Sequence, residues 1–274
     1  MSFTHVAVFY NQQKPHNQPV AQQAAAWLAA HHVETEVVTS FENLAHTDLL
    51  ICLGGDGAML RCARETAALQ IPILGVNCGT LGFLAACEKT DFEQALTEIF
   101  KGNFSIQKRM MLAAEVQSPT GEKQSLLALN DCVLRADKPR ALTVQADFNG
   151  RQLPPYFGDG VLVSTPTGST AYALAACGPI VAPGVEGLLV TPICAHTLTQ
   201  RPLMLPAEGT LCLRPELKTP LDGAYLSMDG QVNLSLVPDC SIQFTRANVS
   251  AQFITSPRRD FFELLNRKLN WGCR

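Results

Sequence analysis

Residues 49–57 read LLICLGGDG, an apolar run that stops at two glycines and an Asp-Gly pair. A short apolar run bounded by glycines is typical of a buried β-strand. The residues that follow, 58–69, have the composition of a helix. A strand, a glycine-rich turn and a helix in this order predict one repeat of an α/β domain.

The same alternation continues on both sides of this stretch. We expect strands over residues 4–10, 34–39, 48–53 and 72–77, and helices over 18–31, 58–69 and 92–100. Strands that are almost continuously apolar indicate a parallel sheet covered on both faces. The predicted fold class is therefore α/β, with an N-terminal doubly wound α/β domain over residues 1–105.

The pattern changes after about residue 105, where short alternating segments replace the helices. Candidate strands lie at 111–117, 125–135, 141–148, 160–164, 210–214, 224–228 and 233–238, and Asn149-Gly150, Asp222-Gly223 and Asp229-Gly230 mark turns. Short strands separated by turn signals predict a C-terminal all-β, sandwich-like domain, here over residues 106–259. One Gly- and Thr-rich insertion, 165–178, interrupts it with a possible helix over 169–176, and a further helix over 260–269 can return to the first domain.

Composition limits the class of protein. The chain has 274 residues, 47% of them hydrophobic and 16% charged, with a net charge of −3. This balance is typical of a globular protein and argues against a nucleic-acid binder. No stretch approaches the roughly 20 apolar residues that a membrane span needs. The ten cysteines form no CxxC pair, which favours reduced thiols in a cytoplasmic protein over disulfides or zinc.

The GGDG stretch is the first candidate site. Glycines allow a backbone to approach phosphate oxygens closely, and the N-terminus of the following helix favours negative charge. Such loops lie at the carboxyl ends of strands, where open α/β sheets bind ligands. Asp56 at this position can orient a metal or accept a proton from a hydroxyl. The alternative is an ordinary turn in which Asp56 caps the helix.

Three further segments carry polar groups in unusual density. Residues 157–179, FGDGVLVSTPTGSTAYALAACGP, follow Asp159 with four hydroxyl side chains and Tyr172, a composition suited to a sugar or nucleotide. The alternative is a surface turn. Asn130 and Asp131 stand among leucines and valines, where polar groups must be satisfied or functional; taken alone, they favour a structural turn. Residues 227–231, SMDGQ, taken alone, indicate a hairpin turn.

Together these segments resemble the NAD kinases of bacterial type in content and order. The resemblance rests on GGDG at 54–57, NCGTLGFL at 77–84, the Asn130-Asp131 pair, DGVLVSTPTGSTAY at 159–172 and DGQ at 229–231, and spans residues 50–231. The central motif is specific, whereas diacylglycerol and sphingosine kinases share GGDG. The resemblance implies an α/β domain, a β-rich NAD-binding domain and an active site between them. It also implies transfer of a phosphoryl group from ATP to the 2′-hydroxyl of the adenosine ribose of NAD.

The resemblance also assigns roles to residues. Asp56 matches the catalytic aspartate, Gly57 and Arg61 match residues that meet phosphate, and Asp159 and Gln231 match residues near the dinucleotide. Asn130 and Asp131 match the pair that contacts adenosine, in which glutamate is more usual at the second position. Arg140 falls close to a basic ligand position. The segment that lines the NAD pocket corresponds to Thr170, Ala171, Tyr172, Ala173, Leu174 and Ala175.

The chain departs from the family pattern at three positions. Phe157 stands where many members carry a basic residue, Cys177 replaces a usual glycine, and Ala195 replaces a usual proline.

The resemblance further implies a homodimer or homotetramer in the cytosol and a divalent cation, Mg²⁺, that accompanies ATP; no residue is assigned as a metal ligand. Two alternatives remain: a lipid kinase that shares GGDG, against which the polar 159–172 loop argues, and a non-catalytic dinucleotide sensor, against which Asp56 argues. The use of polyphosphate or NADH and inhibition by NADP(H) are left open.

Overall fold

The structure is a computed structural model that describes residues 3–217, 223–255 and 260–271. The chain forms two compact units: unit 1 is Met1–Lys108 with Ser250–Arg274, and unit 2 is Arg109–Val249. Unit 2 is therefore an insertion in the sequence of unit 1. The sequence-based boundary at residue 259 differs from this division because one strand, β17 (Ser241–Thr255), begins in unit 2 and ends in unit 1.

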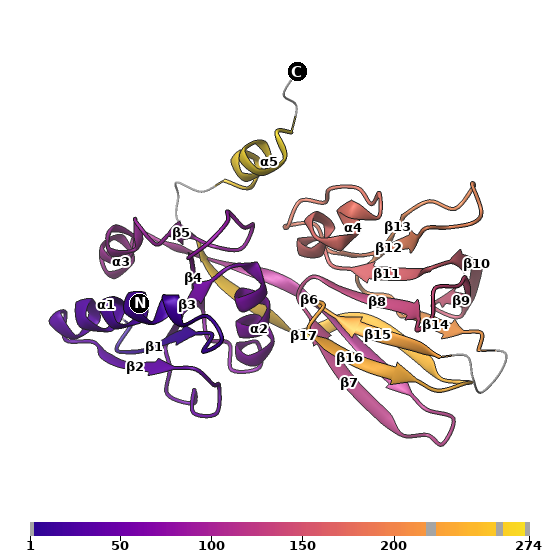
Figure 1. Ribbon diagram of the computed structural model, residues 1–274, viewed down its shortest axis with the longest axis horizontal. Coiled ribbons are helices and arrows are strands. Elements are labelled where there is room, and N and C mark those ends of the chain that lie inside the picture. The colour runs from indigo at the N-terminus through magenta and orange to yellow at the C-terminus, as the bar shows by residue number, and fades with distance from the viewer. Residues whose placement is uncertain (1–2, 218–222, 256–259, 272–274) are drawn as a thin grey trace. The chain divides into compact units, whose positions relative to one another are not determined.

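Unit 1 is built on a parallel sheet with the strand order β4-β3-β1-β2 (Figure 1). The end of β17 pairs in parallel with β4 at Phe253 and Ile73. The elements of this unit are β1 (His5–Tyr10), α1 (Gln18–Ala30), β2 (Glu34–Val38), β3 (Leu49–Gly54), α2 (Asp56–Thr66), β4 (Ile73–Asn77), β5 (Cys87–Glu88), α3 (Phe92–Phe100) and α5 (Phe261–Leu269), with a short 3-10 turn at Pro15–Asn17.

Strand β3 is buried along its whole length because helices cover both faces of the sheet. Leu49, Ile51 and Leu53 point toward α1 and α3 and share one hydrophobic cluster with them. Helix α2 packs on β3 and β4, where Gly75 leaves room for Met59: a Cβ at residue 75 would lie 2.8 Å from the Met59 sulfur. The predicted doubly wound α/β domain is confirmed.

Unit 2 contains two antiparallel sheets. One has the order β13-β12-β11-β8-β15-β16; the other contains β10, β9, β14 and β17 in that order, together with the paired strands β6 and β7. Their bounds are β6 (Ser105–Gln117), β7 (Lys123–Ala128), β8 (Asp131–Ala136), β9 (Leu142–Phe148), β10 (Arg151–Gly158), β11 (Gly160–Ser164), β12 (Gly187–Ile193), β13 (Leu203–Pro206), β14 (Leu211–Pro215), β15 (Ala224–Met228) and β16 (Val232–Leu236).

Alternate residues of the two sheets meet in a single core, so the predicted sandwich-like domain is confirmed. Val161 and Val163 of β11 face Val144 and Phe244 of the other sheet within this cluster. The opposite face of β11 carries Leu162, which packs beneath a helical segment formed by η2 (Thr167–Thr170) and α4 (Tyr172–Ala175).

Several predicted elements differ from the structure. Residues 125–135 form two strands instead of one, because the chain leaves one sheet after β7 and enters the other at β8. Helix α2 begins at Asp56 instead of residue 58 and ends at Thr66 instead of 69. The predicted helix 169–176 is divided at Ala171, whose φ of −99° and ψ of −129° are not helical.

The sequence analysis missed strands β5, β10, β12, β13 and β17. Strand β10 contains Pro154 and Pro155, which argue against an interior strand; it lies at a sheet edge with an irregular register there. Turn signals were more dependable: Asn149 and Gly150 join β9 to β10 with φ of 52° and 76°. Asp222, which the sequence analysis assigned to a turn, and Cys273, one of the ten cysteines, lie outside the described residues.

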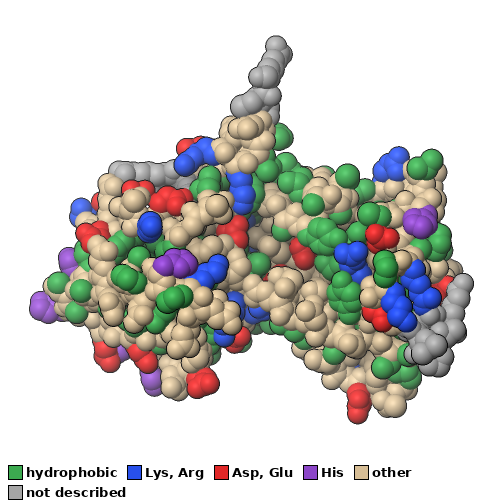
Figure 2. All heavy atoms as spheres, viewed as in Figure 1, with side chains coloured by type: hydrophobic (Ala, Val, Ile, Leu, Met, Phe, Trp, Pro, Cys, Tyr) green, Lys and Arg blue, Asp and Glu red, His purple; other side chains and the backbone are tan. Residues whose placement is uncertain are grey.

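The apolar character of the helices and the distribution of charge on the surface both bear on function. Within the described ranges, none of the helices has both the length and the apolar character to cross a membrane. On the face seen in Figure 2, Lys and Arg side chains lie among Asp and Glu side chains and do not form one continuous basic area.

Candidate active site

The GGDG loop fixes the Asp56 side chain through its neighbours. Strand β3 ends at Gly54, Gly55 is extended with ψ of −174°, and Asp56 begins α2. The Asp56 carboxylate accepts hydrogen bonds from the amides of Phe83, at 3.0 Å, and Leu84, at 3.2 Å. Asp56 therefore does not act as an ordinary helix cap; it is tied to the segment that follows β4.

That segment must approach Asp56 closely, which explains the glycine in its NCGTLGFL sequence. A Cβ at Gly82 would lie 2.0 Å from Oδ1 of Asp56. Any side chain at position 82 would thus displace the carboxylate. Two motifs separated by more than twenty residues in sequence form one constellation in unit 1.

A cation from the end of the chain lies beside the same carboxylate. The Lys268 ammonium of α5 is 3.8 Å from Oδ2 of Asp56 and 4.6 Å from the centre of the Phe83 ring. Phe261, at the start of α5, packs on that ring at 6.5 Å. Asp56 and Lys268 remain partly exposed, with 29% and 33% of their side-chain surfaces accessible.

The Arg61 guanidinium lies in a different direction. It sits over the rings of Phe9 and Phe41, 5.8 Å and 5.2 Å from their centres. These two rings stack at 4.5 Å. Arg61 and Gly57 are both exposed, so the backbone around them is accessible from solvent, but the guanidinium is held on an aromatic platform by cation–π contacts.

In unit 2, Asp229 organises the turn between β7 and β8. Its carboxylate accepts hydrogen bonds from three successive amides, those of Leu129, Asn130 and Asp131, at 3.1, 2.8 and 3.2 Å. Its own amide donates to the Asp131 carbonyl at 2.9 Å. Asp229 has a φ of 51°, a conformation that aspartate tolerates better than most residues. The Asn130-Asp131 pair is thus held by a residue that sequence analysis assigned only to a turn.

The hydroxyl-rich loop is anchored to the same turn. Thr165 donates its amide to the Asn130 carbonyl at 2.9 Å, and its hydroxyl donates to the Leu129 carbonyl at 2.5 Å. Gly168 permits the contact, since a Cβ there would lie 2.0 Å from the Asn130 carbonyl oxygen. The Ser169 hydroxyl donates to the Pro166 carbonyl and accepts from the Val181 amide. These hydroxyls hold the loop in place; they are buried and engaged with the chain.

A cavity of about 790 Å³ opens beside this turn. Arg135 connects two of the polar groups there: it donates to the Tyr172 hydroxyl at 3.5 Å and lies 4.0 Å from the Asp159 carboxylate. The side chains that line the cavity include Asn130, Asp131, Arg135, Tyr172, Ser227 and Asp229.

The cavity contains an unusual acidic pair. Asp131 and Asp229 are 5% and 9% exposed. Burial raises the pKa of Asp131 to about 7, the nearby charge of Asp229 adds to this rise, and the amide N–H of Tyr172 opposes it. A carboxyl group with this pKa can donate a hydrogen bond near neutral pH, which an ordinary aspartate cannot do.

The structure distributes the remaining predicted residues as follows. Ala171 lines the cavity with Tyr172, whereas Ala173 is buried against Leu162 and faces the core. Gln231 is exposed in the β15–β16 turn, and its amide donates to the Met228 carbonyl. Thr170, Leu174 and Ala175 belong to η2 and α4, and the Thr170 hydroxyl donates to the Thr167 carbonyl.

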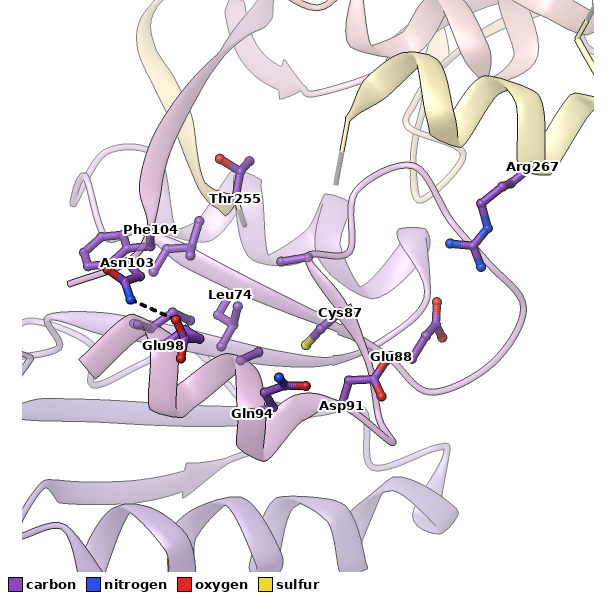
Figure 3. A pocket seen from close by; sticks show the side chains of 14 residues that line it. Leu74, Cys87, Glu88, Asp91, Gln94, Glu98, Asn103, Phe104, Thr255 and Arg267 are labelled. Carbon is purple, nitrogen blue, oxygen red and sulfur yellow. Dashed lines mark hydrogen bonds between the residues drawn. The ribbon is translucent and has the colours of Figure 1, made fainter. Parts of the chain in front are cut away.

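Arg140 lines a separate, smaller cavity of about 200 Å³ with Phe157 and Glu216. The Phe157 ring also packs edge-on against His196 at 5.0 Å. A third cavity, of about 250 Å³, lies in unit 1 beside α3 and is lined by Leu74, Cys87 and Glu88 among others (Figure 3). None of the residues predicted for the site lines that third cavity.

Comparison with known proteins assigns the family. Residues 10–104 match the ATP-NAD kinase N-terminal domain, and residues 129–256 match the ATP-NAD kinase C-terminal domain. A curated relative, the NAD kinase of Citrifermentans bemidjiense, is 37% identical over 287 residues, covering 98% of this chain and 99% of the relative. The chain belongs to the ATP-NAD kinase family.

Two solved structures have a similar fold. An NAD kinase from Archaeoglobus fulgidus in complex with ATP has a TM-score of 0.78 and 25% identity, covering 96% of this chain and 98% of that one. Yeast NADH kinase complexed with NADH has a TM-score of 0.92 at 23% identity, covering 100% of this chain and 89% of that one, and bears on the fold alone. The resemblance of the sequence motifs to NAD kinases is therefore confirmed.

One departure from the pattern of the ATP-NAD kinase family, Cys177, has an unfavourable backbone conformation. Cys177, in place of a usual glycine, has a φ of 64° just after α4. This left-handed conformation is free for glycine and unfavourable for other residues. Cys177 is also exposed, as is Cys194, while most of the other cysteines that the structure describes are buried free thiols.

The sequence analysis gave no site role to three residues: Asp229, Lys268 and Arg135. An aspartate before glycine is typical of a hairpin turn, and the resemblance gave a role in the DGQ motif only to Gln231, so Asp229 received none. Lys268 follows Arg267 in an ordinary basic helix end, and only the packing of α5 brings it to Asp56. Arg135 projects from a strand that the sequence had joined to the preceding one.

Proposed function

We propose that this protein transfers the γ-phosphoryl group of ATP to the 2′-hydroxyl of the adenosine ribose of NAD, which gives NADP. The observation that carries this proposal is the Asp56 carboxylate, fixed by two amides in the GGDG loop of a chain that belongs to the ATP-NAD kinase family. The curated relatives bear the name NAD kinase, and one solved relative is complexed with ATP.

Asp56 would act as the base for the acceptor hydroxyl. A ribose hydroxyl is a weak nucleophile, and a carboxylate within hydrogen-bonding reach can take its proton as the phosphoryl group transfers. Both oxygens of Asp56 already accept an amide hydrogen bond, so the carboxylate is held in one orientation. Each oxygen keeps further acceptor capacity, which leaves room for the hydroxyl proton.

The backbone around Gly57 would bind phosphate. Amides at the start of α2 point away from the helix, and the helix N-terminus favours an anion. Helix α2 extends over eleven residues from Asp56. The exposed position of Gly57 allows phosphate oxygens to come close to these amides.

The 790 Å³ cavity of unit 2 would hold the NAD acceptor. Asn130 and Asp131 offer an amide and a carboxyl group that can recognise adenosine, and Tyr172 offers a ring face and a hydroxyl. Asp159 lies beside Arg135, at the same group of side chains as Tyr172. Gln231, Arg140 and the 170–175 segment remain proposals from the family pattern.

A divalent cation, Mg²⁺, would accompany ATP and neutralise charge on its phosphates. Mg²⁺ usually keeps several waters and binds through one or two carboxylates together with substrate phosphates. The described residues contain no group of three acidic, His or Cys side chains that could hold a metal by themselves. The phosphates of ATP and water would then supply most of the ligands of the ion.

The proposed setting is the cytoplasm, with the protein as a homodimer or homotetramer. Light scattering coupled to size-exclusion chromatography measures the assembly directly. Substitution of polyphosphate for ATP in the activity assay measures whether that donor is accepted.

The decisive experiment incubates the purified protein with ATP, Mg²⁺ and NAD and detects NADP with an NADP-specific dehydrogenase. We expect NADP to form with time and protein concentration. An assay with diacylglycerol or sphingosine in place of NAD tests the lipid-kinase alternative. Binding of NAD without formation of NADP would instead identify a dinucleotide sensor and contradict the proposed activity.

A further inference from the structure

The GGDG loop is flanked by two cations that differ in what they face. The Arg61 guanidinium lies on the Phe9 and Phe41 rings. The Lys268 ammonium lies 3.8 Å from the Asp56 carboxylate. Since phosphoryl transfer builds negative charge that a nearby cation can stabilise, the residue that faces Asp56 is the better placed of the two.

The contacts of Lys268 do not satisfy its ammonium. Its separation from Oδ2 of Asp56 is longer than a hydrogen bond, which for N–H···O spans about 2.7–3.2 Å. Both Asp56 oxygens accept backbone amides without help from the lysine. The other contact, with the face of the Phe83 ring, uses charge and no hydrogen bond. Among the residues that the structure describes, the ammonium thus has an ion pair and a ring contact but no hydrogen bond, so its three N–H donors are available to an incoming anion.

The backbone of Lys268 is held beside Asp56, and only the length of its side chain limits where the ammonium can move. Helix α5 is placed beside Asp56 by Phe261, whose ring packs on Phe83, and the amide of Phe83 donates to Asp56. One aromatic residue thus joins the carboxylate, the cation and the helix. A flexible four-carbon stem allows the ammonium to move from carboxylate to phosphate.

We propose that Lys268 contacts the transferring phosphoryl group and supplies the positive charge that acts together with Asp56. This inference rests on the proposed function. In the step concerned, the bond from the ribose 2′-oxygen to the γ-phosphorus forms and the bond from that phosphorus to the β,γ-bridging oxygen breaks. Asp56 takes the hydroxyl proton, ADP leaves, and Lys268 stabilises the negative charge of the γ-phosphoryl oxygens.

The test compares three variants of the full-length chain: Lys268→Met, Lys268→Arg and Arg267→Met. Arg267 is the matched control, because it precedes Lys268 on α5 but lines the separate cavity of unit 1 beside Glu88 (Figure 3). For each variant, kcat, the KM for ATP, the KM for NAD and the melting temperature are measured.

We expect Lys268→Met to lower kcat by about 10- to 1,000-fold, the range for loss of one transition-state contact. The KM for NAD should stay within about twofold of the wild-type value, because NAD does not depend on this contact for binding. Lys268→Arg should restore part of kcat, and Arg267→Met should remain close to wild type. A purely structural role would lower the melting temperature and affect the two positions alike.

The inference is overturned if the wild-type enzyme makes NADP and Lys268→Met keeps kcat within about twofold. It is also overturned if loss of activity follows loss of folded protein, or if Arg267→Met has the same effect. A wild-type protein that makes no NADP overturns the proposed function itself, and with it this inference. The two failures are therefore distinguishable from the wild-type assay alone.

Discussion

Each unit contains a carboxylate that holds neighbouring backbone amides, but the two are placed in opposite surroundings. Asp56 in unit 1 accepts two successive amides and has an ammonium 3.8 Å away. Asp229 in unit 2 accepts three successive amides and has another carboxylate, Asp131, as its charged neighbour. The same local device thus serves two different electrostatic environments.

The difference follows from exposure and from the sign of the neighbouring charge. Asp56 remains 29% exposed, whereas Asp131 and Asp229 are almost fully buried. Partial exposure leaves the Asp56 carboxylate accessible to an acceptor hydroxyl, whose proton it would take under the proposed function. Burial beside a like charge suits a carboxyl group that recognises a ligand through a hydrogen bond. We therefore expect changes in unit 1 to affect the chemical step and changes in unit 2 to affect acceptor binding or stability.

The largest expected effect is a loss of kcat on substitution of Asp56. The substitution Asp56→Asn keeps the shape of the side chain but removes the base, so kcat should fall by about 10²- to 10⁴-fold. Binding of NAD, measured by calorimetry, should stay within a few-fold of the wild-type value. Near wild-type turnover in this variant would show that Asp56 is not the base in the chemical step. The proposed difference in role between Asp56 and Asp229 would then be wrong.

The second effect concerns pH and Asp131. Its pKa is raised from 3.8 to about 7, so the folded state binds a proton more tightly than the unfolded state. Stability from this group is fully present below pH 3.8 and is lost as the pH rises through about 7. Relative to Asp131→Asn, the wild type should lose up to about 1.4 kcal/mol per pH unit across that window.

Urea unfolding of both proteins between pH 4 and pH 8 measures this difference. Ser164→Ala provides the control, because Ser164 pairs with Asp131 across the strands but does not titrate. Its stability difference from wild type should be independent of pH. A flat difference for Asp131→Asn as well would show that burial beside Asp229 has no effect on its protonation.

A smaller effect is expected at Tyr172, which lines the unit 2 cavity. Tyr172→Ala should raise the KM for NAD by about 3- to 10-fold, the loss of one aromatic contact, and leave the KM for ATP nearly unchanged. Tyr172→Phe, which loses only the hydroxyl that accepts from Arg135, separates the ring from the hydroxyl. Equal increases in both KM values with a lower melting temperature would mean that Tyr172 only packs the loop.

The smallest effect is expected at Cys177, just after α4. Cys177→Gly should stabilise the protein by about 1 kcal/mol, because a left-handed φ costs a non-glycine residue about that much. Cys177→Ala keeps the Cβ and should give no comparable gain. Denaturant unfolding of the two variants compares them directly, and an equal gain for both would assign the effect to the thiol.

The fold was largely predictable where one hydrophobic pattern continued over the whole length of a strand or helix. Buried parallel strands such as β3 read as apolar runs, and α3 was placed at its observed bounds. Prediction was wrong where tertiary context overrode local pattern. Strand β10 contains two prolines at a sheet edge, and the apolar run 125–135 divides because Asp229 holds the turn between the two sheets.

The site was predictable in part for the same reason. Residues within a continuous motif, such as Asn130, Asp131 and Tyr172, could be nominated from sequence, and the structure places them at one cavity. Residues whose position depends on long-range packing could not. Lys268 is 212 positions from Asp56, and Asp229 is 98 positions from Asp131. No local pattern reports such distances.

The insertion of unit 2 within unit 1 has a consequence for synthesis of the protein. A ribosome translates all of unit 2, through Val249, before it reaches the residues that finish unit 1. Phe253, which pairs with β4, and Lys268, which lies beside Asp56, are both translated after the whole of unit 2. A nascent chain can therefore fold unit 2 while the GGDG loop still lacks Lys268, so a product interrupted after unit 2 would not carry the Asp56–Lys268 pair.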